Sequence, residues 1–165
     1  MDERLKEAFH KIYEGEAKAA LRLKIFAKKA DQEELPQIGK LFRVIAFSEE
    51  IHGERALRML REIKDTDTNL KESFGSETSI AGVAYDRFVE LAEEIGDITA
   101  SNIFSNSKDV EDGHAKLYKK AMNHLVGERE TTYYMCQVCG YVSDGVWSVD
   151  CPVCSAPKDQ FVEFK

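Results

Sequence analysis

The sequence lacks an apolar stretch of the roughly 20 residues that a membrane-spanning helix needs. It also lacks an excess of basic residues, because 23 Lys and Arg stand against 30 Asp and Glu and give a formal net charge of −7 at pH 7. No Gly-x-Gly-x-x-Gly motif is present, so we expect no dinucleotide to bind to this chain itself. These absences predict a protein that works with neither membranes nor nucleic acid as partners.

Cysteine is scarce, and all four cysteines lie close to the C-terminus. Cys136 and Cys139 form one Cys-x-x-Cys pair, and Cys151 and Cys154 form a second pair, with eleven residues between the two pairs. Residues 1–16 are charged and amphipathic rather than typical of a signal peptide, so we expect a cytoplasmic location, where cysteines serve as metal ligands rather than disulfides. Two such pairs predict a four-sulfur site for iron or zinc.

Apolar residues recur at helical spacing through the first three quarters of the chain. We expect helices at 5–30, 36–63 and 69–95, and a fourth from Asp97 or Thr99 to about Val126. Thr66 or Thr68 is a candidate N-cap for the third helix. The predicted fold is mainly α: a four-helix bundle in residues 1–130, followed by a small metal-binding β module in residues 131–165 that needs its metal to fold.

Two Glu-x-x-His patterns, Glu49 to His52 and Glu111 to His114, lie in the second and fourth predicted helices. Residues three apart share one helix face, so each pattern points a carboxylate and an imidazole in the same direction. Two such helices, facing two more that each supply one glutamate, form the ligand set of a di-metal site in a four-helix bundle. We assign Glu49 and Glu111 as the bridging pair.

The two lone glutamates are Glu16 and Glu77. Glu16 would complete the ligand set of the metal bound by His52, and Glu77 that of the metal bound by His114. From the pattern alone, Glu14 competes with Glu16, and Glu72 and Asp86 compete with Glu77. Four buried carboxylates need compensation, and two divalent cations balance their charge of −4. Mixed carboxylate and imidazole ligands suit iron or manganese.

Several segments make the chain resemble rubrerythrin along its whole length. Before the tail, these segments are Glu14-Gly15-Glu16-Ala17, residues 26–30 and 38–42, Asn69-Leu70-Lys71, Gly75-Ser76-Glu77, Tyr85, Phe88, residues 92–94 and Leu117-Tyr118. In the tail, residues 136–141 and 151–161 resemble the two cysteine loops of rubredoxin, with Tyr134, Tyr141, Trp147, Phe161 and Phe164 as a candidate aromatic core. The resemblance favours Glu16 and Glu77 among the competing carboxylates, and iron in the four-cysteine site.

The resemblance implies a ferritin-like di-iron bundle with a C-terminal rubredoxin module. It implies an oxidoreductase that protects against oxidative stress by reducing hydrogen peroxide to water at two irons. The rubredoxin-type iron would pass on the electrons, which come from NAD(P)H through a separate reductase or from rubredoxin. It also implies a homodimer, with the rubredoxin module of one chain near the di-iron site of another.

Two positions depart from the family pattern. Ile80 stands where the family has an additional glutamate that exchanges with the second-helix histidine, and Leu23 stands where it tends to have a tyrosine near the irons. Both changes leave iron binding intact but favour a second possibility, a ferroxidase or oxygen-reducing di-iron protein. A third possibility is a protein without catalytic activity that stores iron or carries zinc.

Overall fold

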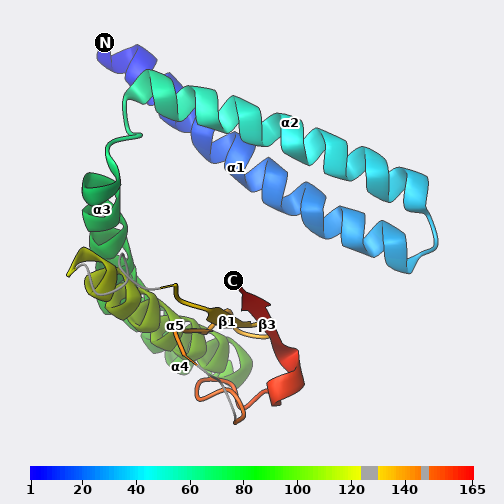
Figure 1. Ribbon diagram of the computed structural model, residues 1–165, viewed down its shortest axis with the longest axis vertical. Helices are drawn as coiled ribbons and strands as arrows, with labels where there is room; N and C mark the ends of the chain where they lie inside the picture. The colour runs from blue at the N-terminus through cyan, green and yellow to red at the C-terminus, as the bar shows by residue number, and fades with distance from the viewer. Residues whose placement is uncertain (124–129, 146–148) are drawn as a thin grey trace. The chain divides into compact units, whose positions relative to one another are not determined.

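The computed structural model describes residues 1–123, 130–145 and 149–165 of the chain (Figure 1). The chain divides into two compact units, Met1–Lys64 and Asp65–Lys165. No helix within the described ranges is both long and apolar enough to cross a membrane.

The first unit is a hairpin of two long helices, α1 (Glu3–Gln32) and α2 (Pro36–Leu60), which lie side by side in Figure 1. Asp2 caps α1 by accepting a hydrogen bond from the backbone N–H of Arg4. Pro36 occupies the first turn of α2, where its missing N–H leaves no hydrogen bond unmade. Both predicted helices are confirmed, although α2 ends three residues earlier than expected.

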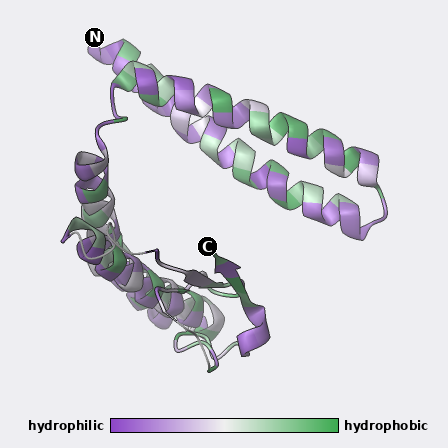
Figure 2. Ribbon diagram, in the orientation of Figure 1, coloured by the Kyte–Doolittle hydropathy of each residue, from purple (hydrophilic) through white to green (hydrophobic). Residues whose placement is uncertain are grey.

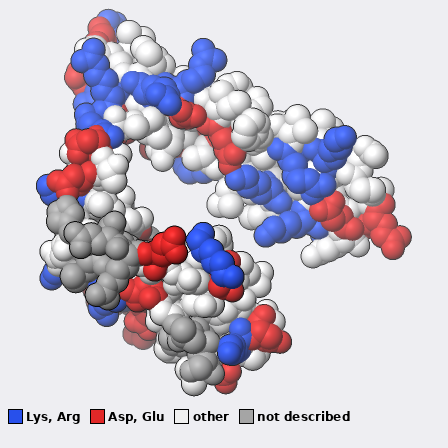
Figure 3. All heavy atoms as spheres, in the orientation of Figure 1, with Lys and Arg blue, Asp and Glu red and all other residues white. Residues whose placement is uncertain are grey.

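Small residues form the contact between the two helices of the hairpin. The buried positions are Ala20, Ala27, Ala30, Gly39, Ala46, Gly53 and Ala56. Salt bridges from Lys24 to Glu50 and from Arg43 to Asp31 connect the helices at the surface, where Figure 3 shows charges of both signs along the hairpin. The hairpin therefore packs closely without burying a single large apolar side chain completely.

The second unit begins with α3 (Thr66–Ser79), which continues through a short π-helix, η1 (Ile80–Ala84), into α4 (Tyr85–Ile95). Asp65 caps α3 by accepting from the N–H of Thr68, so the expected caps Thr66 and Thr68 were wrong. The Asp65 carboxylate accepts two hydrogen bonds on separate oxygens, one from the Thr68 N–H and one from the Thr68 hydroxyl, whereas a threonine side chain offers a single oxygen.

Helix α5 (Ile98–Met122) follows a two-residue connection. Gly96 adopts a left-handed conformation with φ of 79° and ends α4, and Asp97 caps α5 through the N–H of Ala100. The expectation that α5 starts after Asp97 is confirmed. Its expected extension to Val126 falls outside the described residues.

A three-stranded antiparallel sheet completes the second unit, with strand order β2-β1-β3. The strands are β1 (Tyr133–Cys136), β2 (Val142–Ser143) and β3 (Phe161–Phe164), with a turn of 3₁₀-helix, η2 (Lys158–Gln160), before β3. Tyr141 and Phe161 pack against the buried cysteines as expected. Phe164 is half exposed and does not join this core, and Trp147 lies outside the described residues.

Candidate metal centres

Three of the predicted ligands lie together in the helical hairpin: Glu16 from α1, and Glu49 and His52 from α2. His52 Nδ1 lies 3.0 Å from Glu49 Oε2 and 3.9 Å from Glu16 Oε1. Two ligands bound at right angles to one metal, each about 2.1 Å from it, lie about 3.0 Å apart, so the His52 to Glu49 spacing fits a metal. These three side chains can hold one ion.

The competitor Glu14 and two other carboxylates of the hairpin have other contacts. Glu14 lies 3.8 Å from Lys18 one helical turn away, and Glu54 forms a salt bridge with Arg58. Glu50 pairs with Lys24 across the hairpin. The geometry therefore places Glu16 rather than Glu14 beside the imidazole, as the resemblance implied.

The second unit brings together the other three predicted ligands, Glu77 from α3 and Glu111 and His114 from α5. His114 Nδ1 lies 3.0 Å from Glu111 Oε2, which repeats the geometry of the hairpin triad. The competitor Asp86 forms a salt bridge with Lys108. All three members of this triad are half-buried, whereas His52 of the hairpin triad, which has the same composition, is exposed.

The charge of the second triad has a measurable consequence for Glu77. Burial, together with the neighbouring Glu111 carboxylate, raises the pKa of Glu77 to about 7, and the charge of His114 only partly opposes this. Two carboxylates this close cannot both ionise freely without a compensating cation. A bound metal ion would supply that cation.

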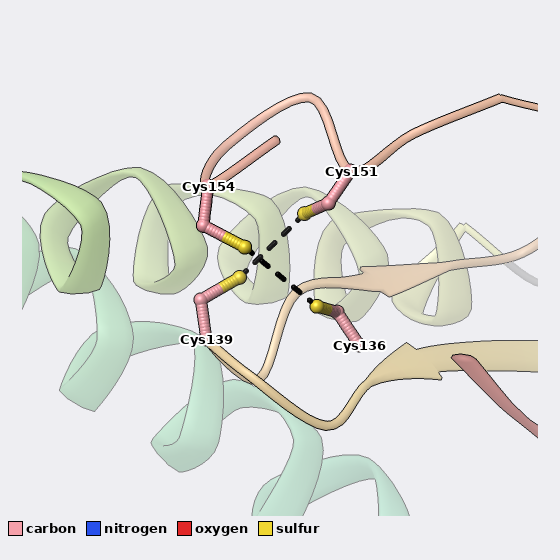
Figure 4. Close-up of side chains that lie close together, drawn as sticks. All are labelled: Cys136, Cys139, Cys151 and Cys154. Carbon is pink, nitrogen blue, oxygen red and sulfur yellow. Dashed lines mark hydrogen bonds between the residues drawn. The ribbon is translucent and has the colours of Figure 1, made fainter. Parts of the chain in front are cut away.

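The four cysteine sulfurs point toward a common centre (Figure 4). Cys136 Sγ lies 3.8 Å from Cys154 Sγ, and Cys139 Sγ lies 3.6 Å from Cys151 Sγ. The edge of a tetrahedron with metal–sulfur bonds of about 2.3 Å measures about 3.8 Å. The cysteines are therefore spaced for a tetrahedral ion rather than for disulfides.

The two cysteine loops have the same backbone hydrogen bonds. Gly140 N–H donates to Cys136 O at 2.9 Å, and Ser155 N–H donates to Cys151 O at 2.9 Å. Gly140 and Ser155 both have positive φ, 85° and 58°, which turns the chain back sharply after each pair. Each loop thus presents its two sulfurs on one side.

Backbone N–H groups also point at the sulfurs. Burial opposes ionisation of Cys136, yet hydrogen bonds from the N–H groups of Cys139 and Val138 leave its pKa below the ordinary value. Burial raises the pKa of Cys139 and Cys154, although the N–H groups of Tyr141 and Ala156 stabilise their thiolates. These donors would stabilise the thiolate ligands and tune the reduction potential of a bound iron.

The four-cysteine module lies against α5 of its own unit. A Cβ at Gly113 would be 3.9 Å from the Tyr141 ring, and a Cβ at Gly140 would be 3.9 Å from Val110. Lys120 of α5 donates to Asp144 at 2.8 Å. Tyr141 therefore lies between the cysteine site and α5, because its N–H reaches the Cys139 sulfur and its ring lies beside Gly113, which precedes His114.

Sequence reasoning missed the contact between Tyr141 and Gly113 and the salt bridge between Lys120 and Asp144. It also missed Gly53, which follows His52 and lies buried against Glu16 of α1. A glycine directly next to each ligand histidine, at 53 and 113, is the signal that could have indicated close approach at both places.

Comparison with known proteins agrees with both parts of the chain. Residues 5–122 match the family model described as Rubrerythrin, and residues 134–162 match the model described as Rubrerythrin, rubredoxin-like domain. Nigerythrin of Nitratidesulfovibrio vulgaris is 28% identical over 91% of this chain and 81% of its own length. Rubrerythrin-2 of Clostridium acetobutylicum is 28% identical over 92% of each chain.

Solved structures of nigerythrin resemble the whole fold. The mixed-valence state has a TM-score of 0.57 and the fully reduced, all-ferrous state one of 0.59, each at 27% identity and over 96% of this chain and 86% of the other. The predicted fold class, a mainly helical ferritin-like protein with a small four-cysteine sheet, is confirmed. The family match and the two donor types also support iron at both kinds of site.

Proposed function

The chain belongs to the rubrerythrin family of di-iron oxidoreductases, and from this premise we propose that it reduces hydrogen peroxide to water. The observation that carries the proposal is the pair of matched triads, each with two carboxylates and one imidazole at metal-binding spacing. We propose that both triads bind one pair of irons. Glu49 and Glu111 would bridge the pair, Glu16 and His52 would complete one iron, and Glu77 and His114 would complete the other.

The chain's own residues prepare this site in two ways. Four carboxylates supply a charge of −4, which balances two divalent ions and makes the cluster favourable in an apolar bundle. Each Glu-x-x-His pair fixes its imidazole against a carboxylate of the same helix at 3.0 Å, so the donors need little rearrangement when an ion binds. Ferrous irons bound there would supply the two electrons that cleaving the O–O bond of peroxide requires.

The four-cysteine module supports a route for returning those electrons. Tyr141 connects the module to α5, because its N–H stabilises the Cys139 sulfur and its ring lies against Gly113, next to His114. The Lys120 to Asp144 salt bridge holds the same interface together. We propose that electrons from an NAD(P)H-dependent reductase, or from rubredoxin, enter at the cysteines and pass along this contact to the bundle site.

A cysteine variant tests this route. In Cys151→Ser, reductase-driven turnover with peroxide should stop, because the module loses one of its four ligands. Chemical reduction of the bundle site, followed by a single addition of peroxide, should still oxidise the irons at the wild-type rate. Reductase-driven turnover that continues unchanged in Cys151→Ser would show that electrons reach the bundle by another route.

Ile80 favours one second candidate function, the reduction of dioxygen. It lies three residues after Glu77, on the same helix face, and its side chain cannot coordinate a metal. The site therefore has the six ligands of the two triads and no carboxylate three residues after Glu77 to follow a change in oxidation state. Stopped-flow oxidation of the reduced protein decides between the two functions. Faster oxidation by peroxide than by dioxygen at equal concentrations supports the peroxidase, and the opposite order supports the oxidase.

A further inference from the structure

The connections between helices are all short. Three residues, 33–35, join α1 to α2; five residues, 61–65, join α2 to α3; and two residues, 96–97, join α4 to α5. A ferritin-like bundle contains one long crossover that runs the length of the bundle, so that the helices on either side of it point the same way. None of the three connections has the length of such a crossover.

The helix lengths give the size of the gap. His52 lies eight residues before the end of α2 and Glu77 lies eleven residues after the start of α3, or about 12 Å and about 16 Å at 1.5 Å per residue. If α2 and α3 of one chain run parallel with their ligands level, the end of α2 and the start of α3 are about 28 Å apart. Six fully extended residue steps reach about 22 Å at most.

The connection is in fact shorter than its fully extended length. Arg61 adopts a left-handed conformation with φ of 58°, and the N–H groups of Arg61 and Glu62 bond to the carbonyls of Arg58 and Leu57. This cap turns the chain back at the end of α2. The three residues that remain before α3 therefore cannot make the crossover that the fold requires.

The hairpin nevertheless has a face that needs a partner. Ile38, Leu41 and Ile45 share the face of His52 at helical spacing and are 44%, 53% and 37% exposed, while the contact between α1 and α2 buries only alanine and glycine. Figure 2 shows hydrophobic residues along both helices of the hairpin. An exposed apolar face in line with His52, one donor of the proposed six-donor site, indicates a surface that packs against a partner.

We propose that two copies of this chain exchange their hairpins. The α1–α2 hairpin of one copy packs on α3, α4 and α5 of the second copy, and the reverse contact closes a twofold dimer. Each di-metal site then takes Glu16, Glu49 and His52 from one chain and Glu77, Glu111 and His114 from the other. The inference rests on the proposed function for these six ligands and adds that no single chain holds a complete site.

Mixed dimers test the exchange through their iron content rather than their activity. A chain carrying His52→Ala and a differently tagged chain carrying His114→Ala are produced together, and the dimer with both tags is purified. Exchange places both lesions in one bundle and leaves the other intact, so about half of the wild-type bundle iron should remain. Bundles closed within each chain would carry one lesion each, and no intact site would form.

The control pairs His52→Ala with Glu16→Ala. Both lesions lie in the hairpin, so neither arrangement can produce an intact site, and this pair defines the iron that damaged sites retain. Bundle iron in the test dimer that does not exceed this control overturns the exchange. If the wild-type dimer itself holds no bundle iron, the proposed function fails instead, so the two failures are distinguishable.

The length of the connection gives a second measurement that does not involve iron. Inserting about 20 Gly and Ser residues between residues 63 and 64 gives a flexible chain with a typical span near 28 Å, which is enough for the crossover within one chain. We expect light scattering to show that the inserted variant forms monomers at concentrations where the wild type is a dimer. A wild-type protein that is monomeric while holding its bundle iron would overturn the exchange.

Discussion

Gly53 lies where α2 packs against α1 beside the hairpin triad, and its replacement should separate packing from ligation. An ideal Cβ at this position lies 3.7 Å from Glu16 Cβ and 3.8 Å from a carbon of the Tyr13 ring. These are ordinary van der Waals distances, so Gly53→Ala fits without movement. Because alanine favours a helix over glycine by about 1 kcal/mol, we expect this variant to be more stable by up to that amount and to keep its iron.

Gly53→Leu should have the opposite effect. In rotamers that point toward α1, its Cγ lies about 1.5 Å beyond the Cβ and crowds the Glu16 and Tyr13 side chains. Overpacking of this kind costs about 1 to 3 kcal/mol, which equals or exceeds the gain in helix propensity. The displaced Glu16 would also leave His52 and Glu49 as an incomplete set of donors. We therefore expect a net loss of stability and of bundle iron.

Denaturation of the iron-free protein in urea measures the first effect, and iron per chain after anaerobic loading measures the second. Gly15→Leu is the matched control, because Gly15 precedes Glu16 in the same helix and an added Cβ there meets nothing within 4 Å. This control should gain stability and keep its iron. If Gly53→Leu behaves as Gly15→Leu does in both measurements, the close approach at Gly53 does not position the triad.

Three further perturbations address the second unit. In the iron-free protein Glu77 has a pKa of about 7, raised by burial and by Glu111, so at pH 6 it carries a proton that a metal must displace. Iron loading of the wild-type protein at pH 6 should release nearly one proton per chain more than iron loading of Glu77→Gln, which a pH indicator would measure. Equal proton release by the two proteins would contradict this. Gly113→Leu should slow electron transfer from the module, because the leucine side chain displaces the Tyr141 ring. Gly113→Ala is the control and should transfer electrons at the wild-type rate, since its Cβ fits at 3.9 Å from that ring. Equal single-turnover rates in both variants would refute a role for this contact. Ile80→Glu should raise the ratio of peroxide to dioxygen oxidation rates relative to Ile80→Gln, and an unchanged ratio would show that Ile80 does not set the preference.

Periodicity in the sequence was sufficient to predict the helices, because apolar residues repeat at helical spacing along most of them, although α3 has no buried residue. The ends of the helices were less predictable. Asp65 competes with two nearby threonines for the cap of α3, and only the structure shows that its carboxylate satisfies two donors, the N–H and the hydroxyl of Thr68. The π-helix at Ile80–Ala84 has no signal in the hydrophobic pattern beyond Gly82.

The metal ligands were predictable for a different reason. Metal chemistry demands particular residue types at fixed spacing, and Cys-x-x-Cys and Glu-x-x-His preserve that spacing within a single loop or helix turn. The structure groups these residues as expected, although their ligation of iron stays a prediction. The contact of Tyr141 with Gly113 could not be predicted, since it joins a loop to a helix with no local pattern in common. The boundary between the domains at residue 130 also stays a prediction.

Iron counted per chain, with Mössbauer spectra of the anaerobically loaded protein, tests the central claim most directly. The account predicts three irons per chain, one in a four-sulfur site and two as a pair. His52→Ala and His114→Ala should each lose iron from the pair and keep the four-sulfur iron. A wild-type protein that holds iron only at the cysteines, or variants that keep a complete pair, would contradict the assignment of the two triads as one di-iron site.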